Sequence, residues 1–379
     1  MSQWRSCRPY CNDDVVFIDV IGLFPDSDVG SLTPMRLPRC KRNRLFDAAI
    51  ACLAVVVVLW AIGLLDHLLE KPFSEFRWPP YIDVRLEVAL ELNGSSPMHL
   101  YENDWAYFRA KTLPHCEEDN SESISTRNFI LIAVKSAAQN FANRAAIRST
   151  WGAVKRQSGY SLRTIFLVGD LHSEHKNKMG DVLVREADQY GDLLIGDYID
   201  AYRNNTLKFL SAVQLSFSYC STAENTVPFA LLVDDDYFVS IRSLVAEVKR
   251  HRSTQRIYMG WRFDSGPFRL RFHKHRVSLD AYPFDRFPPY ISAGAVLISR
   301  AAIREFYYGI QHVRLFNYDD IYTGIVAYLL AMPPLHNPQM RFWPSAITKQ
   351  DLSHLICAHG FTSKQLIDFY DIIVKQGLN

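Results

Sequence analysis

Three consecutive aspartates, Asp234 to Asp236, end the apolar run LLVDDD. Neighbouring carboxylates repel one another, and a partly desolvated cluster of them needs a cation or hydrogen-bond donors nearby. Side chains alternate along an extended segment, so we expect Asp234 and Asp236 on one side and Asp235 on the other. Two carboxylates on one side suit a hard divalent cation such as Mg²⁺ or Mn²⁺. A solvated turn, or a cap for the next helix, explains the triplet equally well, so the rest of the sequence must decide.

Two arginines and a second acidic pair could complete such a site. Arg144 and Arg148 lie four residues apart in a predicted helix and share one of its faces, where they could clamp a diphosphate. Ordinary solvated cations are the commoner explanation for an arginine pair. Asp319 and Asp320 precede an apolar helical stretch, where they could cap the helix or supply a catalytic base.

A histidine near the end of the chain is a candidate metal ligand. His359 lies in the segment ICAHGF, between apolar residues and a glycine. A lone histidine is more often structural than a ligand. A metal held by two aspartates nevertheless leaves room for one imidazole.

The elements that must position these residues alternate between strands and helices. Short apolar runs predict the strands, and amphipathic stretches between them predict the helices. The alternation predicts an α/β domain with a mostly parallel sheet and right-handed crossovers. In such sheets ligands bind beyond the carboxyl ends of the strands, which is where the aspartates lie. The predicted strands are NFILIAVKS, TIFLVGD, GDLLIGDYID and PFALLVDDD, and the predicted helices are QNFANRAAIRSTWG, LKFLSAVQLSFSYC and SIRSLVAEVKRHR.

An uncharged apolar stretch, Ala48 to Leu65, is long enough to cross a bilayer as a helix. It begins too far from the N-terminus for an ordinary signal peptide and lacks a small-residue cleavage site. A buried core helix is the other alternative. Basic residues precede the stretch, and Asp66 and Glu70 follow it, so the N-terminal side should face the cytosol. The sequence therefore predicts a single-pass type II membrane protein.

Four segments follow from this arrangement. Residues 1–45 form a predicted cytosolic tail and residues 46–65 a transmembrane signal-anchor. Residues 66–127 contain several prolines and the polar run CEEDNSESIST, which is typical of a luminal stem. Part of this segment, especially YENDWAYFRA, could instead pack against the domain that follows. Residues 128–379 hold the alternating strands and helices. A net charge of +2 over 379 residues gives no electrostatic argument for nucleic-acid binding.

The predicted luminal side carries sequence features of the secretory pathway. Asn93 and Asn204 begin glycosylation sequons. Cys116, Cys220 and Cys357 would lie in an oxidising compartment. Because three is an odd number, at most one disulfide forms within the chain, and the remaining thiol is free or links a homodimer.

The order and the residues of several motifs resemble those of a known family. The motifs are RAAIRSTWG, FLVGD, VDDDYFVS, FPPYISAGAVLIS, DDIYTG and AHGF, all within residues 128–368. They resemble the β-1,3-glycosyltransferases of glycosyltransferase family 31, Golgi enzymes that transfer galactose or N-acetylglucosamine from a UDP-sugar. The chain looks most like the subgroup that contains the insect protein brainiac. The resemblance implies a GT-A-type nucleotide-sugar-binding catalytic domain over residues 128–379 and a Golgi membrane location with that domain in the lumen.

The resemblance also implies roles for the aspartate triplet and the histidine. Asp236 and His359 would ligate Mn²⁺, which bridges the diphosphate of UDP. Asp234 and Asp235 would lie near the ribose and the sugar of the donor.

Further roles follow for the other candidate residues. Arg144 and Arg148 match nucleotide-binding arginines of the family. Gly294, in the SAG motif, matches a loop close to the donor sugar and the acceptor. Asp320 matches the acidic residue taken as the general base, with Asp319 as the fallback.

The implied reaction is an inverting transfer of GlcNAc or Gal, from UDP-GlcNAc or UDP-Gal, to the 3-hydroxyl of an acceptor glycan on a glycolipid or glycoprotein. One alternative is a catalytically inactive membrane-anchored protein that binds sugar nucleotides or glycans. Another is a luminal metal-dependent hydrolase that uses the same acids. The chain departs from the family in having His275 where a tryptophan follows a lysine, and in its long cytosolic tail, which leaves the acceptor open.

Overall fold

The chain is described by a computed structural model that covers residues 11–12, 39–40, 44–98, 100–101, 110–116, 128–171, 176–220, 224–344 and 347–377. It divides into two compact units. The first comprises Met1–Glu70 and Phe268–Pro283, and the second comprises Lys71–Pro267 and Phe284–Asn379. Most of the predicted cytosolic tail lies outside the described residues.

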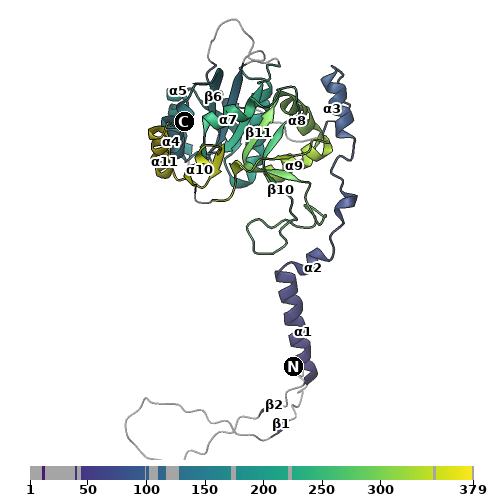
Figure 1. Cartoon of the computed structure of the whole chain (residues 1–379). Coiled ribbons are helices and arrows are strands. Elements are labelled where there is room, and N and C mark those ends of the chain that lie inside the picture. The colour runs from purple at the N-terminus through teal and green to yellow at the C-terminus, as the bar shows by residue number, and fades with distance from the viewer. Residues whose placement is uncertain are drawn as a thin grey trace, which may run out of the picture. The chain divides into compact units, whose positions relative to one another are not determined.

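A mixed sheet forms the centre of the second unit (Figure 1), with the strand order β12-β10-β11-β8-β4-β6-β7-β3. The four central strands β8, β4, β6 and β7 are parallel, whereas β11 runs antiparallel to β8 and β3 antiparallel to β7. The predicted α/β class is confirmed. The strands are β3 (Ala110–Thr112), β4 (Phe129–Lys135), β6 (Tyr160–Asp170), β7 (Leu193–Ile199), β8 (Phe229–Asp234), β10 (Tyr258–Phe263), β11 (Tyr290–Ser299) and β12 (Leu335–His336), and the short β5 (Arg156–Gln157) pairs with β6.

Helices cover both faces of this sheet because its central strands are apolar on both sides. Every residue of β4 is buried, and alternate residues of that strand lie in a core that also contains residues of α4 and α11. The helices α6, α8 and α9 pack against one another. The helices of this unit's α/β part are α4 (Phe141–Ser149), α5 (Lys176–Tyr190), α6 (Asn205–Phe217), α7 (Ile241–Val248), α8 (Arg300–His312), α9 (Asp319–Leu329), α10 (Lys349–Leu352) and α11 (Ser363–Lys375).

A small second sheet joins the C-terminal part of the chain to the aspartate triplet. Its central strand β14 (Cys357–His359) pairs antiparallel with β9 (Tyr237–Val239) and parallel with β13 (Met340–Arg341). The register places His359 opposite Tyr237. A histidine 123 residues away in sequence from Asp236 is thereby brought next to it.

Part of the predicted stem belongs to the second unit. The helix α3 (Val84–Leu92) is joined to α8 by a buried hydrogen bond of 2.7 Å between Glu91 and His312. The indole of Trp78 is buried and donates a 2.8 Å hydrogen bond to a main-chain carbonyl after α8. β3 extends the central sheet. The compact unit therefore begins well before residue 128, because these earlier residues supply apolar and paired polar groups that pack on it.

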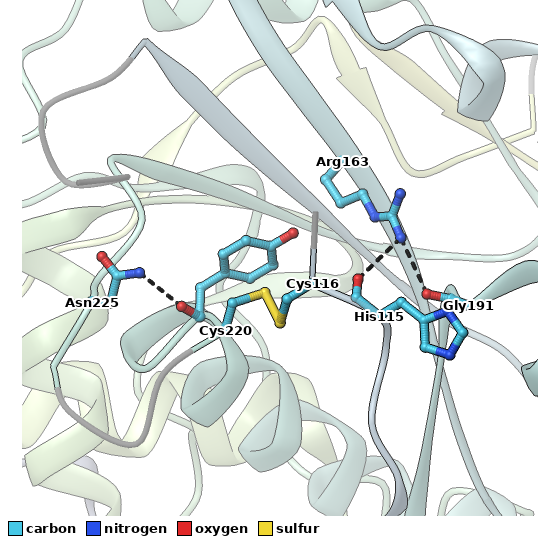
Figure 2. The surroundings of a disulfide bond; sticks show 7 residues. His115, Cys116, Arg163, Gly191, Cys220 and Asn225 are labelled. Carbon is cyan, nitrogen blue, oxygen red and sulfur yellow. Dashed lines mark hydrogen bonds between the residues drawn. A yellow bond between two sulfur atoms is a disulfide. The ribbon is translucent and has the colours of Figure 1, made fainter. Parts of the chain in front are cut away.

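Two of the three cysteines that were predicted to be luminal, Cys116 and Cys220, form a disulfide (Figure 2). Cys116 follows β3 and Cys220 follows α6, so the bond ties the predicted stem to the α/β part of the unit. The prediction of at most one disulfide among these three cysteines is confirmed. The odd thiol is Cys357, which is fully buried in β14, so the group on which the predicted homodimer rested is not accessible to a second chain.

The first unit contains the apolar helix α1 (Arg44–Ala61), which has a mean hydropathy of 2.1 and no buried residue. Within the described ranges it is the one helix long and apolar enough to cross a membrane. It coincides with the predicted signal-anchor and is compatible with a type II membrane anchor. The short helix α2 (Leu64–His67) follows it, and β1 (Cys11–Asn12) pairs with β2 (Arg39–Cys40) before it.

Candidate active site

A buried lysine organises the acidic residues at the carboxyl edge of the central sheet. Lys135 ends β4, and in the parallel register it pairs with Asp234, which ends β8. Its ammonium nitrogen lies 3.0 Å from the Asp234 carboxylate and 2.6 Å from the Asp319 carboxylate at the start of α9. One cation thus joins acids that are far apart in the sequence.

Lys135 was not among the residues predicted for the site. Burial lowers the pKa of this ammonium, but Asp234 and Asp319 more than offset that effect, so the pKa is raised and the lysine stays charged. The signal was a charged residue at the end of the otherwise apolar run FILIAVK, one strand away from the triplet. A buried lysine almost always has a partner, which this one finds in two carboxylates.

The middle aspartate lies in the turn that follows β8 and has hydrogen-bond partners of its own. The Asp235 carboxylate accepts hydrogen bonds from the hydroxyl of Ser136 at 2.6 Å and the amide of Asn140 at 3.0 Å. Asn143 donates a third, at 3.4 Å. These contacts hold the turn in which the triplet lies. A direct contact of Asp235 with a donor sugar stays a prediction.

The last aspartate and the histidine form a pair. The imidazole Nε2 of His359 lies 3.0 Å from a carboxylate oxygen of Asp236, and this hydrogen bond raises the pKa of His359. The imidazole stacks on the Phe342 ring at a centroid distance of 5.7 Å, with an interplanar angle of 6°. The main-chain oxygen of Asp236 also accepts hydrogen bonds from Gly360 and Phe361 at 3.1 and 2.9 Å, so the backbone fixes the pair.

The same pair fits a divalent metal. The second carboxylate oxygen of Asp236 is buried and has no hydrogen-bond partner among the described residues, so it is available as a ligand. Nowhere in the described part of the chain do three or more acidic, histidine or cysteine side chains form a ready-made metal cluster. Mg²⁺-like ions often take one or two protein ligands and complete their shell with substrate phosphates and water. Asp236 and His359 fit that kind of site.

The second acidic pair begins α9 without capping it. The residue that precedes the helix is Tyr318, whose side chain makes no capping hydrogen bond. The Asp320 carboxylate accepts a 2.8 Å hydrogen bond from the Ile321 amide. Burial, and then the neighbouring Asp319 carboxylate, raise the pKa of Asp320 to about 7. Asp319 is paired with Lys135, so the two neighbouring acids have different environments.

Gly294 lies in β11, close to the residue that follows the triplet. A Cβ atom built at this position would come within 2.1 Å of the Tyr237 hydroxyl, which is closer than atoms can approach. The absence of a side chain therefore lets the buried Tyr237 ring lie beside this strand. The structure gives Gly294 a packing role, and its predicted proximity to a donor stays a prediction.

The two arginines have partners within the protein. The Arg144 guanidinium is fully buried and forms a bidentate pair with Glu186, at 2.9 and 2.7 Å. Arg148 also contacts Glu186, at 2.6 Å, and pairs with Asp192 at 2.7 Å. Burial raises the pKa of Glu186, but the two arginines outweigh that effect and the pKa is lowered. The shared helix face was predicted correctly, but it faces two carboxylates of the fold.

Arg144 nevertheless connects to the triplet through one hydroxyl. Its guanidinium donates a 3.0 Å hydrogen bond to Ser136, and the Ser136 hydroxyl donates to Asp235. This chain of contacts makes Arg144 a positioning residue for the turn that carries the aspartates. Direct contact of Arg144 or Arg148 with a nucleotide stays a prediction.

The two sequon asparagines lie in different surroundings. Asn93 is exposed just after α3, and its side chain contacts the carbonyl of Ala89 at 2.9 Å. Asn204 is half-buried and donates a 2.8 Å hydrogen bond to the Ile199 carbonyl. The hydroxyl of Thr206, in the same sequon, is buried. Glycosylation at either position stays a prediction.

Comparison with known proteins identifies the family of this chain. The family model described as Galactosyltransferase matches residues 142–338, which include the aspartate triplet and the acids of α9. A crystal structure of the galactosyltransferase LgtC in complex with donor and acceptor sugar analogues matches 66% of this chain and 100% of its own, at 12% identity and a TM-score of 0.33.

Several relatives cover most of the chain. The β-1,3-galactosyltransferase bre-5 of Caenorhabditis elegans is 33% identical over 325 residues, which are 85% of this chain and 91% of the relative. The β-1,3-galactosyltransferase brn of Drosophila melanogaster is 34% identical over 326 residues, 85% and 93% of the two chains. The UDP-GalNAc:β-1,3-N-acetylgalactosaminyltransferase 1 of Mus musculus is 28% identical over 288 residues, 73% and 83% of the two chains. The chain belongs to the galactosyltransferase family, among the β-1,3-glycosyltransferases that include brn.

Proposed function

We propose that this glycosyltransferase is an inverting, Mn²⁺-dependent β-1,3-transferase that moves a hexose from a UDP-sugar to the 3-hydroxyl of an acceptor glycan. The observation that carries the proposal is that two sets of acidic side chains, each with its own partner, lie at one edge of the sheet. Lys135 holds Asp234 beside Asp319, while Asp236 is paired with His359. The site therefore offers a metal-binding pair and a carboxylate base within one group of connected residues.

Asp236 and His359 would hold the Mn²⁺ ion, which when bound supplies Lewis-acid stabilisation of the diphosphate leaving group. The protein residues keep these ligands in place. The main-chain hydrogen bonds to Asp236 and the stacking of His359 on Phe342 orient both side chains. Lys135 holds Asp234 and Asp319 and prevents their mutual repulsion.

Asp320 is the proposed general base. A carboxylate with a pKa near the working pH is the most effective base, and burial with the Asp319 charge raises the pKa of Asp320 to about 7. Asp320 would take the proton of the acceptor 3-hydroxyl while that oxygen bonds to the anomeric carbon. The bond from this carbon to UDP breaks at the same time, and its electron pair leaves with UDP. One displacement inverts the anomeric centre, so an α-linked donor gives a β product.

The donor and acceptor are the finer part of the proposal. We infer UDP-Gal or UDP-GlcNAc as the donor, and the names of the relatives from worm and fly support galactose. The name of the mouse relative adds N-acetylgalactosamine as a donor to test. We infer an acceptor glycan on a glycolipid or glycoprotein, and a Golgi location with the catalytic unit in the lumen, where α1 is the anchor.

The test is transfer by the full chain in detergent. UDP-Gal, UDP-GlcNAc and UDP-GalNAc are each offered with galactosyl, mannosyl and N-acetylgalactosaminyl acceptors, with Mn²⁺ or with a chelator. We expect a β-1,3 product from one donor that requires Mn²⁺ and is lost in Asp236→Asn. Asp368→Asn changes an exposed acid on α11 and is the matched control.

Two outcomes would contradict the proposal. Folded protein that binds UDP but transfers no sugar to any acceptor would favour an inactive binding protein. Release of sugar from the donor without any acceptor, at the rate seen with acceptor, would favour a hydrolase.

A further inference from the structure

The loop Phe268–Pro283 belongs to the same compact unit as the apolar helix α1, although it connects two strands of the catalytic sheet. In the first residues of this loop, arginine side chains that are buried or half-buried alternate with apolar side chains that are exposed. Arg269 is 1% exposed, whereas Phe272 is 81% exposed. Phe268 and Leu270 are exposed as well, and Arg271 is half-buried. A segment in water normally buries its apolar side chains and exposes its charged ones, so this loop has the inverse pattern.

The loop is attached to the last residues of α1. The main-chain amide of Arg271 donates a 3.1 Å hydrogen bond to the carbonyl of Ala61. Its guanidinium donates to the carbonyl of Trp60 at 3.2 Å and lies 4.3 Å from the centroid of the Trp60 ring. The final carbonyls of a helix have no partner within the helix, and the loop supplies a donor to the Ala61 carbonyl and a second donor, besides the Gly63 amide, to the Trp60 carbonyl. These contacts fix the loop at the C-terminal end of α1.

The inward arginines are neutralised by acids that follow the helix. Arg269 pairs with Glu70 at 2.7 Å, and Arg271 pairs with Asp66 at 2.9 Å. Arg269 also donates to the main-chain carbonyls of Val277 and Tyr282. A buried guanidinium is stable only with such partners. The charges are thus used to hold the loop, and its apolar side chains are left outside.

The length of α1 indicates at which level of a bilayer the loop lies. α1 has 18 residues, and a helix of that length rises about 27 Å. That is close to the hydrocarbon thickness of about 30 Å in a typical bilayer. Trp60 therefore lies near the luminal boundary if Arg44 lies at the cytosolic one, and tryptophan is enriched at such boundaries. The loop, which contacts Trp60, lies at the same level.

Other exposed apolar residues lie in the segment that follows α1. Leu64, Leu68 and Leu69 are 44%, 76% and 71% exposed. We call these three leucines, together with the exposed apolar residues of the loop, the interfacial patch, which consists of Leu64, Leu68, Leu69, Phe268, Leu270 and Phe272. The three leucines follow α1, a helix that has no buried residue, and the loop residues flank Arg271, which is hydrogen-bonded to the end of that helix.

We propose that the interfacial patch inserts into the luminal leaflet of the bilayer that α1 spans, at the boundary between headgroups and acyl chains. The leucines directly follow α1 and the loop is bonded to its last residues, so we expect the same medium to cover the helix and the patch. The exposed Lys274 lies two residues after Phe272 and can extend its ammonium to lipid phosphates while the phenyl ring is buried. The inference rests on the membrane span and does not require glycosyl transfer.

Insertion would give the catalytic unit a second attachment to the membrane. β10 ends before the loop and β11 begins after it, so both ends of the inserted segment lead into the central sheet. The stem alone would leave the unit on one tether. With the loop in the leaflet, the sheet is held at two points of the chain.

The test places a fluorescent label at Phe272 in the full chain. Phe272→Cys, in a background where the tail cysteines and Cys52 are serines, is labelled with an environment-sensitive dye and reconstituted in phosphatidylcholine vesicles. Part of the lipid carries a nitroxide near the headgroup or near the chain terminus. Ile372→Cys, an exposed apolar position on α11, is the matched control. We expect blue-shifted emission at position 272 that the shallow nitroxide quenches more than the deep one, and neither effect at position 372.

Several results would overturn the proposal. A label at position 272 that emits as in water shows that the loop is outside the membrane. Blue-shifted emission that no nitroxide quenches shows that a protein surface, such as a second copy of the chain, covers the patch. Equal quenching at both positions shows unspecific adsorption. A further variant, Phe272→Asp with the label at Leu270→Cys, should lose the quenching, although α1 still anchors the chain.

Discussion

The edge of the catalytic sheet and the loop Phe268–Pro283 both contain charged and aromatic residues, but they bury opposite groups. At the sheet edge the strands are buried, and the charges of Lys135, Asp234 and Asp319 meet where the strands end. In the loop Arg269 is buried in an ion pair with Glu70, and Phe272 is exposed. The difference teaches that the side chains a segment buries depend on the medium around it. That medium is water and substrate at the sheet edge, and in our proposal it is lipid at the loop.

The largest expected effect concerns the sheet edge. Asp320→Asn removes the proposed base and leaves the shape of the side chain nearly unchanged, so we expect kcat to fall by about 10²–10⁴-fold. Single-turnover rates with saturating donor check this. Asp319→Asn should cost less, because that carboxylate is paired with Lys135. If kcat falls further in Asp319→Asn than in Asp320→Asn, the general base is Asp319.

The next effect concerns stability. Lys135→Met leaves Asp234 and Asp319 without their shared cation, and we expect the free energy of unfolding to fall by about 3 kcal/mol. Denaturant unfolding of the variant measures it. The double variant Lys135→Met/Asp319→Asn should recover part of the loss, since one of the unpaired charges is gone. Equal stability of wild type and Lys135→Met would show that the lysine does not organise the edge.

A smaller effect is expected in the pH profile. The base must be ionised, and the pKa of Asp320 is raised to about 7, so kcat/KM should fall as the pH decreases through neutrality. Asp319→Asn removes one of the two causes of the raised pKa. The profile of that variant should therefore shift to lower pH, which a series of buffers at constant ionic strength would show. An unchanged pH profile would show that the Asp319 carboxylate does not raise the pKa of the group that titrates.

The smallest effect is expected in the loop. Phe272 is largely exposed, so Phe272→Asp should change the free energy of unfolding in detergent by less than about 0.5 kcal/mol. The same variant should move the loop out of a bilayer. Arg269→Met is the contrasting change, because it leaves Glu70 without its buried partner and should expose the loop to protease. If the two variants had the same stability and the same sensitivity to protease, the exposed phenylalanine and the buried arginine would not have different roles in the loop.

Much of the site could be predicted because its signals are local. The apolar run before the triplet predicted a strand, which the structure confirms as β8. Asp234 and Asp235 have different partners, Lys135 and Ser136. The helix face shared by Arg144 and Arg148 was also predicted. The carboxylates behind that face, Glu186 and Asp192, could not be, because they come from α5 and the turn after it.

The boundary of the compact unit was the weakest part of the sequence prediction. Prolines and a polar run before residue 128 favoured a stem. The pairing of β3 with β7 and the hydrogen bond between Glu91 and His312 join these residues to the sheet and to α8. Such contacts depend on partners more than 80 residues away along the chain, which local composition does not report.

The sequence by itself determined the apolar span, the alternation of strands and helices, and the residues able to bind a metal or accept a proton. Each of these depends on the periodicity and type of neighbouring side chains. Only the tertiary structure decided that Lys135 joins Asp234 to Asp319, that His359 pairs with Asp236, and that the loop arginines turn inward. The physical reason is that charges separated along the chain acquire their partners from strand register and loop attachment, and neither is encoded in any single segment.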